Sequence, residues 1–202
     1  MEEIISKQEL EELKKIGGEV RGAALKDDAR FILKEKGNEG LKKLEEAMAK
    51  FGFPIKYKKL KEMGFYPLKA DVLSVLLIKR LFGFSDKEIQ EMGKFEAQSS
   101  FVLRLFLKYF ASVETIAQKG PGIWKKYYSR GNLKIAELNK EKRYVVLRIE
   151  DFDLPSFYYQ PLMGYFAGVL QMIVKKPVVC RERECADSKI VCREFLLEWQ
   201  EG

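Results

Sequence analysis

Apolar residues in the first two-thirds of the chain recur every three or four positions, which is typical of helices that lay one stripe on a core. Ser6 with Glu9, and Ser85 with Glu88, match the capping-box pattern that begins a helix. Glycines, other cap residues and prolines mark further boundaries. The pattern predicts helices over 6–16, 25–36, 39–51, 67–82 and 89–110, with two short helices that begin at Ser112 and at Pro121. A break in the 89–110 helix near Gly93 or at Ser99-Ser100 is an alternative.

After Gly131 the apolar positions alternate instead, which favours β-structure. We expect a hairpin of strands 133–138 and 144–149, an uncharged helix over 156–174, and strands 178–184 and 190–199 that turn near Asp187 and Ser188. The predicted fold class is α+β. An α-helical N-terminal half packs with a C-terminal ββαββ unit, whose hairpins form an antiparallel sheet with the helix on its face.

A chain of 202 residues with 47% hydrophobic residues is long enough for one buried main domain. We predict a helical extension over 1–23, followed by a single ligand-binding-like α+β domain over 24–202. Its helical part covers 24–130 and its ββαββ part covers 131–200. Lysine and glutamate are abundant and asparagine is scarce, a composition that fits adaptation to heat.

The charge pattern indicates no nucleic-acid partner. The 37 basic and 30 acidic residues are interspersed along most of the chain, as on solvated helix faces. The most basic tract runs from Lys56 to Lys61 and includes a tyrosine, as a phosphate-contacting surface can. Because the tract is short and no DNA-reading motif accompanies it, we interpret it as a solvated face.

One uncharged stretch, residues 154–174, is long enough to cross a membrane. It contains two prolines and two glutamines, and its tyrosines are spread along it rather than grouped at the ends. We therefore interpret it as a buried core helix and predict no membrane span. The N-terminus is acidic and lacks the apolar segment of a signal peptide, so we expect a cytoplasmic location.

The three cysteines, Cys180, Cys185 and Cys192, fall in one short C-terminal tract. The chain has no histidine, so any soft-metal chemistry would use these thiolates, and histidine-based catalysis is excluded. They are candidate ligands of a metal such as zinc, with a nearby carboxylate or a partner chain as fourth ligand. Their spacing lacks the usual short Cys-x2-Cys pair. A disulfide and free or buried thiols remain as alternatives.

Several segments of the C-terminal part form a recognisable set. They are 124–131 (Trp-Lys-Lys-Tyr-Tyr-Ser-Arg-Gly), the hairpin that follows, 164–166 (Gly-Tyr-Phe), and Cys185 and Cys192 leading into Phe195 and Trp199. Together these segments resemble the 4-vinyl reductase domain family. That family shares a fold superfamily with haem nitric-oxide-binding sensors and TRAPP-type trafficking subunits. The resemblance implies a domain that encloses a small ligand between helices and sheet, as a sensor or binding module and often as a dimer.

The haem-binding relatives use a proximal histidine and a Tyr-x-Ser-x-Arg motif for the haem propionates. Tyr127 and Ser129 match the motif, but Arg130 follows the serine directly. Together with the missing histidine, this departure argues against histidine-ligated haem. Nothing in the sequence supplies a nucleotide-binding glycine loop or a clear acid–base pair, so we rank a reductase lowest.

The second candidate site is a group of aromatic residues. Some of them come just before the predicted sheet, and the others lie on the uncharged helix. An apolar pocket with a few hydroxyls can orient a small ligand, and an arginine can bind its carboxylate or phosphate. The alternative is that these rings simply form core. The predicted ligand-binding residues are Trp124, Tyr127, Tyr128, Arg130, Tyr158, Tyr165 and Phe166.

These observations lead to the hypothesis of a non-catalytic binding or sensor domain for a small hydrophobic or amphipathic ligand, acting as a homodimer. The alternative is a dimeric scaffold similar to the TRAPP-type subunits. Gly164 and Gly168 lie four apart on the uncharged helix, and we expect them to let it approach the sheet or a ligand closely.

Overall fold

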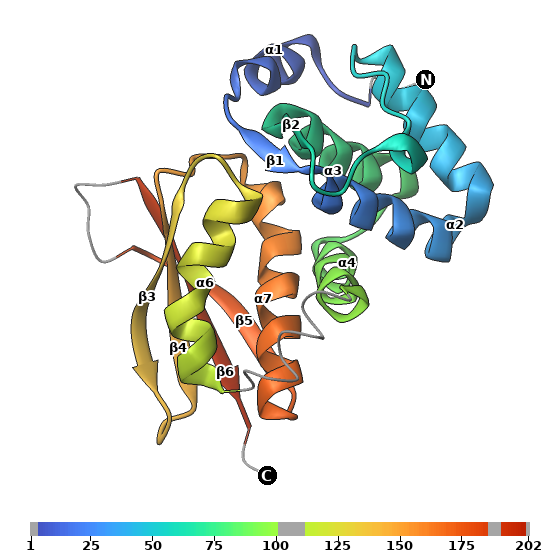
Figure 1. Cartoon of the computed structure of the whole chain (residues 1–202). Helices are drawn as coiled ribbons and strands as arrows, with labels where there is room; N and C mark the ends of the chain where they lie inside the picture. The colour runs from blue at the N-terminus through green and yellow to red at the C-terminus, as the bar shows by residue number, and fades with distance from the viewer. Residues whose placement is uncertain (1–3, 101–111, 186–190, 201–202) are drawn as a thin grey trace. The chain divides into compact units, whose positions relative to one another are not determined.

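The structure is a computed structural model that describes residues 4–100, 112–185 and 191–200. The chain divides into two compact units, Met1–Ile89 and Gln90–Gly202, which follow one another along the colour ramp of Figure 1. The sequence analysis placed no boundary after Ile89. Its division at residue 24 stays a prediction.

The first unit is mainly helical, as the apolar spacing predicted. The capping box is present, because Ser6 Oγ accepts from the Glu9 N–H while the Glu9 carboxylate accepts from the Ser6 N–H. The two helices predicted on either side of Gly37 form one kinked element, in which Gly37 has a φ of 66°. The helices of this unit are α1 (Lys7–Lys15), α2 (Gly22–Lys50) and α3 (Leu68–Phe82), with a short 3-10 turn η1 (Tyr57–Lys59).

Two short strands in the first unit escaped the sequence analysis. They are β1 (Glu19–Arg21) and β2 (Phe65–Pro67), paired antiparallel with Val20 opposite Tyr66. Strands of three residues are too short to show alternation, so only their pairing across a long stretch of chain reveals them. They join the start of α2 to the segment before α3.

The second unit begins within α4 (Asp86–Ser99) and continues with α6 (Val113–Tyr127), the 3-10 turn η2 (Ser156–Tyr158) and α7 (Tyr159–Val174). Ser112 caps α6 as predicted, because its hydroxyl accepts from the Thr115 N–H. The prediction that Pro121 begins a separate helix is wrong. Pro121 lies inside α6, where its fixed φ is helical and only one backbone donor is lost.

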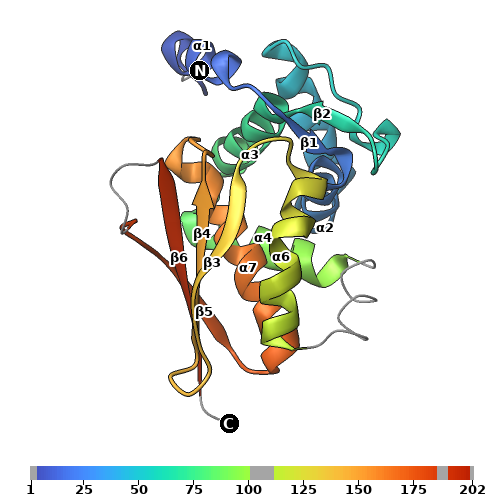
Figure 2. The same cartoon turned by 60° about the vertical axis from the view of Figure 1, so that its left-hand side comes forward.

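The C-terminal sheet confirms the predicted ββαββ order. Its strands are β3 (Asn132–Asn139), β4 (Tyr144–Glu150), β5 (Val178–Arg183) and β6 (Cys192–Trp199). They form one antiparallel sheet in the order β3-β4-β6-β5. Figures 1 and 2 show α6 and α7 on the same face of this sheet. The predicted turn at Asp187 and Ser188 lies outside the described residues.

The glycines of α7 serve a close helix crossing. A Cβ on Gly164 would collide with the carbonyl oxygen of Gln90, and one on Gly93 would collide with that of Pro161. Gly168 faces Ala97 of α4 in the same way, at 3.0 Å from a built Cβ. The close approach expected from the sequence therefore exists, but its partner is α4 rather than the sheet or a ligand.

Within the described ranges, no helix has both the length and the apolar character that a membrane crossing requires.

Candidate functional site

Three rings meet where the end of α6 approaches the segment after β4. Trp124 stacks on Tyr128 with ring centroids 4.4 Å apart, and Phe152 meets both edge-on at 5.0 and 5.3 Å. The hydroxyls of Tyr128 and Tyr158 lie 3.3 Å apart. Three predicted ligand-binding residues, Trp124, Tyr128 and Tyr158, are therefore brought together around Phe152, which the sequence analysis did not select.

The ring contacts continue from Phe152 into the core beneath the sheet. Tyr159 lies 6.4 Å from Phe152 and 6.0 Å from Phe195, and Phe195 lies 5.8 Å from Phe166. Tyr159 also donates its hydroxyl to the Phe152 carbonyl and accepts from the Leu154 N–H at 3.2 Å. Phe166 thus packs in the core with Phe195, away from Trp124 and Tyr128.

Two predicted site residues lie elsewhere. Tyr165 packs beside Ala97 of α4, together with Ile116 of α6 and other residues of α7. Tyr127 is half-buried at the last position of α6, next to Tyr128. The predicted aromatic site is therefore split, and its compact part is the group Trp124, Tyr128, Phe152 and Tyr158, which we call the aromatic cluster.

Arg130 adjoins the aromatic cluster through its backbone. Its carbonyl accepts from the Trp124 indole N–H at 3.2 Å, and Gly131 follows it with a φ of 77°. A Cβ on Gly131 would come within 2.8 Å of the Phe152 ring, so only glycine allows this turn. Arg130 is half-buried, and its guanidinium makes no hydrogen bond or ion pair with any residue that the structure describes.

The cysteine tract contains a disulfide between Cys185 and Cys192, with their Cα atoms 6.0 Å apart. The third cysteine, Cys180, is free and pairs across the sheet with Leu197, far along β6 from Cys192. Burial raises the pKa of the Cys180 thiol to about 12, and the charge of Glu182 adds to the effect. The disulfide, which the sequence left as an alternative, therefore separates the three predicted metal ligands.

In this arrangement the cysteines do not form a shared metal site. No group of three His, Cys, Asp or Glu side chains among the described residues is placed to hold a metal ion. Cys185 and Cys192 have no thiolate to offer while they are bonded to each other, and a thiol with the pKa of Cys180 is protonated at neutral pH. Metal binding by Cys180, Cys185 and Cys192 together stays a prediction.

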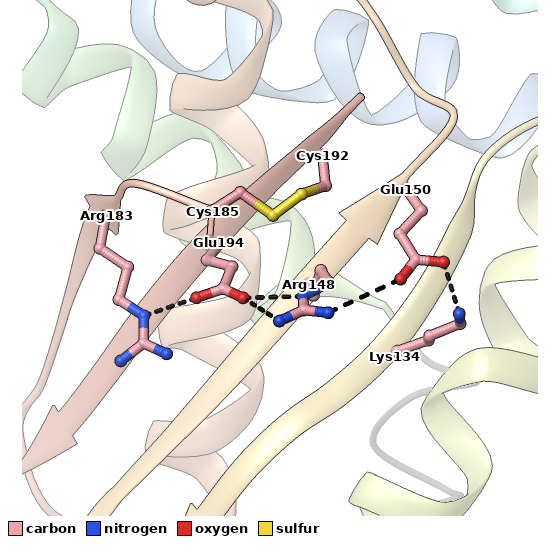
Figure 3. Close-up of a disulfide and its surroundings, with 7 residues drawn as sticks. All are labelled: Lys134, Arg148, Glu150, Arg183, Cys185, Cys192 and Glu194. Atoms are coloured by element: carbon pink, nitrogen blue, oxygen red, sulfur yellow. Dashed lines mark hydrogen bonds and ion pairs between the residues drawn. A yellow bond between two sulfur atoms is a disulfide. The ribbon is translucent and has the colours of Figure 1, made fainter. Parts of the chain in front are cut away.

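A row of ion pairs crosses the sheet next to the disulfide (Figure 3). Glu194 of β6 accepts from Arg148 of β4 and from Arg183 of β5, each at 2.7 Å. At the far end, Glu150 pairs with Lys134 of β3 at 2.5 Å. Because Phe195 faces α7, its neighbour Glu194 points to the opposite face of the sheet.

Glu194 is a fully buried carboxylate that stays charged. Its side chain is 0% exposed, yet two arginines satisfy both of its oxygens. Burial alone would raise the pKa of Glu194, but the hydrogen bonds from Arg183 and Arg148 outweigh it, and the net shift is downward. The ion row therefore ties β4, β5 and β6 together and is a structural feature, because each charge in it already has a partner.

A pocket of about 280 Å³ opens on the disulfide, and its lining includes Phe152, Tyr159, Glu182 and Arg193 as well as both bonded cysteines. The Arg193 guanidinium lies 4.3 Å from the Tyr159 ring centroid and pairs with Glu182. Arg193 already has a partner, whereas the guanidinium of Arg130 has none among the residues that the structure describes. Arg130 beside the aromatic cluster is therefore the better candidate for holding an anionic ligand.

Comparison with known proteins supports the fold and nothing narrower. No protein-family model matches the chain, and no curated protein matches it. Solved structures do match. An H-NOX protein from S. oneidensis in the Fe(II)NO ligation state has a TM-score of 0.67 at 12% identity, and the match covers 90% of this chain and 99% of that one. The chain has an H-NOX-like fold.

Other H-NOX structures agree. The H-NOX domain from Shewanella oneidensis in the Fe(II)CO ligation state has a TM-score of 0.65 at 14% identity, with 90% of this chain and 99% of that one covered. An unliganded Fe(II) H-NOX mutant from K. algicida has a TM-score of 0.63 at 11% identity, covering 90% and 97%. These matches show the fold alone, and the 4-vinyl reductase family is not confirmed.

Proposed function

We propose that this H-NOX-like chain is a non-catalytic sensor or binding domain for an amphipathic anion, held by its apolar part against the aromatic cluster and by its charge at Arg130. The observation that carries the proposal is the half-buried guanidinium of Arg130, which has no partner among the described residues. Leaving such a cation unpaired costs free energy, so a carboxylate or phosphate is its natural complement.

The residues present do not fit the haem that the solved H-NOX structures suggest. The chain has no histidine, so no imidazole can hold the iron. Its cysteines offer no replacement thiolate, because two form the disulfide and the thiol of Cys180 has a pKa of about 12. We therefore propose an H-NOX-like binding domain whose ligand is not histidine-ligated haem. The predicted homodimer and cytoplasmic location stay predictions.

Calorimetric titration with chain-matched probes tests the proposal. We expect dodecanoate and dodecyl phosphate to bind the wild type, and dodecanol to bind more weakly. Arg130→Gln should lower the affinity for both anions by about tenfold, the effect of losing one charge-assisted hydrogen bond, and should leave dodecanol unchanged. Arg181→Gln is the control, because Arg181 is exposed on β5 with only a distant partner, Glu198 at 3.6 Å.

Two results would count against the proposal: anions that bind Arg130→Gln as tightly as the wild type, or no binding of any probe. Native mass spectrometry of the purified protein adds an independent reading. A co-purifying small anion that is lost in Arg130→Gln and kept in Arg181→Gln would support the assignment.

A further inference from the structure

The basic tract interpreted from sequence as a solvated face has an apolar component in the structure. Two side chains just after it, Met63 and Phe65, are 76% and 42% exposed. Exposed apolar side chains that stand together beside cations differ from the ordinary scatter of single apolar residues on a surface. We call Lys58, Lys59, Lys61, Met63 and Phe65 the 58–65 patch.

In the part of the chain that the structure describes, the lysines of the 58–65 patch have no carboxylate partners. Lys58 only donates to the Asn38 side-chain oxygen at 3.3 Å, and no ion pair involves Lys59 or Lys61 among the described residues. By contrast, the preceding Lys56 pairs with Glu45 at 2.7 Å. The neighbouring Glu62 pairs with Lys26 and Arg30, so it does not neutralise the patch.

The backbone holds the 58–65 patch in place at the start of α2. Gly22 N–H donates to the Gly64 carbonyl at 2.8 Å, and Ala23 N–H donates to the Glu62 carbonyl at 3.1 Å. A Cβ on Gly22 would collide with the Lys61 carbonyl, so glycine is needed for this approach. The exposed side chains are therefore presented on a supported loop.

The ring of Phe65 is also flanked by a cation. The Arg21 guanidinium lies 3.8 Å from its ring centroid, and the same group donates to the Met63 carbonyl. An apolar tip surrounded by cations complements the boundary between the lipid headgroups and the acyl chains of an anionic bilayer. There apolar side chains enter the boundary while lysines meet phosphates.

We infer that the 58–65 patch is a peripheral contact for the surface of an anionic lipid bilayer. Met63 and Phe65 enter the headgroup boundary, and Lys58, Lys59 and Lys61 bind the lipid phosphates. A nucleic acid would use the same lysines, but it offers no apolar layer to cover Met63. This inference does not depend on the ligand proposed for Arg130.

Vesicle co-sedimentation with the full chain tests the inference. We expect binding to phosphatidylcholine vesicles that contain roughly one-third phosphatidylglycerol, no binding to pure phosphatidylcholine, and loss of binding at high salt. Met63→Ser/Phe65→Ser and Lys58→Glu/Lys59→Glu/Lys61→Glu should each weaken binding by about tenfold or more. All five positions are exposed, so circular dichroism should show both variants folded.

The matched controls change the same chemistry elsewhere. Lys42→Glu/Lys43→Glu alters two exposed lysines of α2, and Val179→Ser removes an exposed apolar side chain from β5. Both should bind vesicles like the wild type. Equal loss in the lysine control would mean general charge attraction and would overturn the inference. So would duplex DNA binding that needs the patch lysines while vesicle binding is unaffected by Met63→Ser/Phe65→Ser.

Discussion

The two units of the chain each bury a carboxylate, and they treat it in opposite ways. In the helical unit, Asp28 is 3% exposed and its nearest donor is the neutral Ser74 hydroxyl at 2.6 Å, which in turn lies 2.7 Å from the Tyr57 hydroxyl. In the sheet unit, Glu194 is equally buried but is bound by Arg148 and Arg183.

Because their partners differ, the pKa values of the two carboxyl groups shift in opposite directions. Burial raises the pKa of Asp28 well above its usual range, the charge of Asp71 raises it further, and the Ser74 hydrogen bond only partly opposes this. The arginines hold the pKa of Glu194 below its usual range. Burial therefore does not decide the charge of a carboxyl group, because the partner that meets it does.

The largest expected effect comes from removing the charge of the buried carboxylate in the sheet unit, Glu194. Glu194→Gln leaves two guanidinium groups facing an amide, and we expect it to lower the free energy of unfolding by about 3 kcal/mol at pH 7. The control, Glu137→Gln, removes the exposed partner of Arg183 and should cost under about 1 kcal/mol. Both tryptophans, Trp124 and Trp199, lie in the sheet unit, so urea titration followed by tryptophan fluorescence reports on it.

The stability difference between the wild type and Glu194→Gln should change with pH in a defined direction. Because the folded-state pKa of Glu194 is lowered, its stabilisation is present above the pKa of the unfolded state and is lost as pH falls through the folded-state value. The deficit of Glu194→Gln should therefore shrink in acid. A deficit that grows on acidification would contradict the charged assignment.

A smaller effect is expected from the disulfide at the end of the ion row. Cys185→Ser/Cys192→Ser opens a short loop, whose ends are seven positions apart in the sequence, and should lower the free energy of unfolding by about 2–3 kcal/mol. Dithiothreitol should destabilise the wild type similarly and leave the variant unchanged. Cys180→Ser is the control that keeps the disulfide. If the reductant has no effect on wild-type unfolding, the bond is absent.

The smallest expected change in stability comes from replacing Asp28, the buried carboxyl group of the helical unit. Because the folded-state pKa of Asp28 is raised, the wild type loses stability as pH rises from the unfolded-state pKa toward the folded-state one. Asp28→Asn should remove this slope and gain on the order of 1 kcal/mol relative to wild type between pH 5 and 8. Far-UV circular dichroism during urea titration measures it. Glu46→Gln, on the exposed face of α2, should leave the slope intact, and an unchanged slope in Asp28→Asn would refute the neutral carboxyl.

The elements were predictable wherever a local pattern specifies them. The capping boxes at Ser6 and Ser85, the break at Gly37 and the alternation of β3 and β4 all follow from neighbouring residues. Pro121 misled the prediction, because a proline that starts a helix and one tolerated inside it look alike without the surrounding turns. The strands β1 and β2 were missed because their pairing is not local.

The candidate site was predictable only in part. Trp124, Tyr128 and Tyr158 converge as expected, but Phe152 at their centre has no distinguishing spacing, and Tyr165 lies instead against α4. A helix of uniformly apolar residues does not reveal which face meets which neighbour. The lack of a partner for the Arg130 guanidinium, within the described ranges of the chain, could be seen only once its surroundings were known.

The sequence by itself determined the order of strands and helix in the C-terminal ββαββ unit, the α+β class and the exclusion of histidine chemistry, since these depend on residue type and short-range spacing. Only the tertiary structure decided that Cys185 bonds Cys192 while Cys180 stays apart, that α7 approaches α4, and that Glu194 is charged. Strand register and helix crossing bring distant residues into contact, and the energies of those contacts depend on distance in space rather than along the chain.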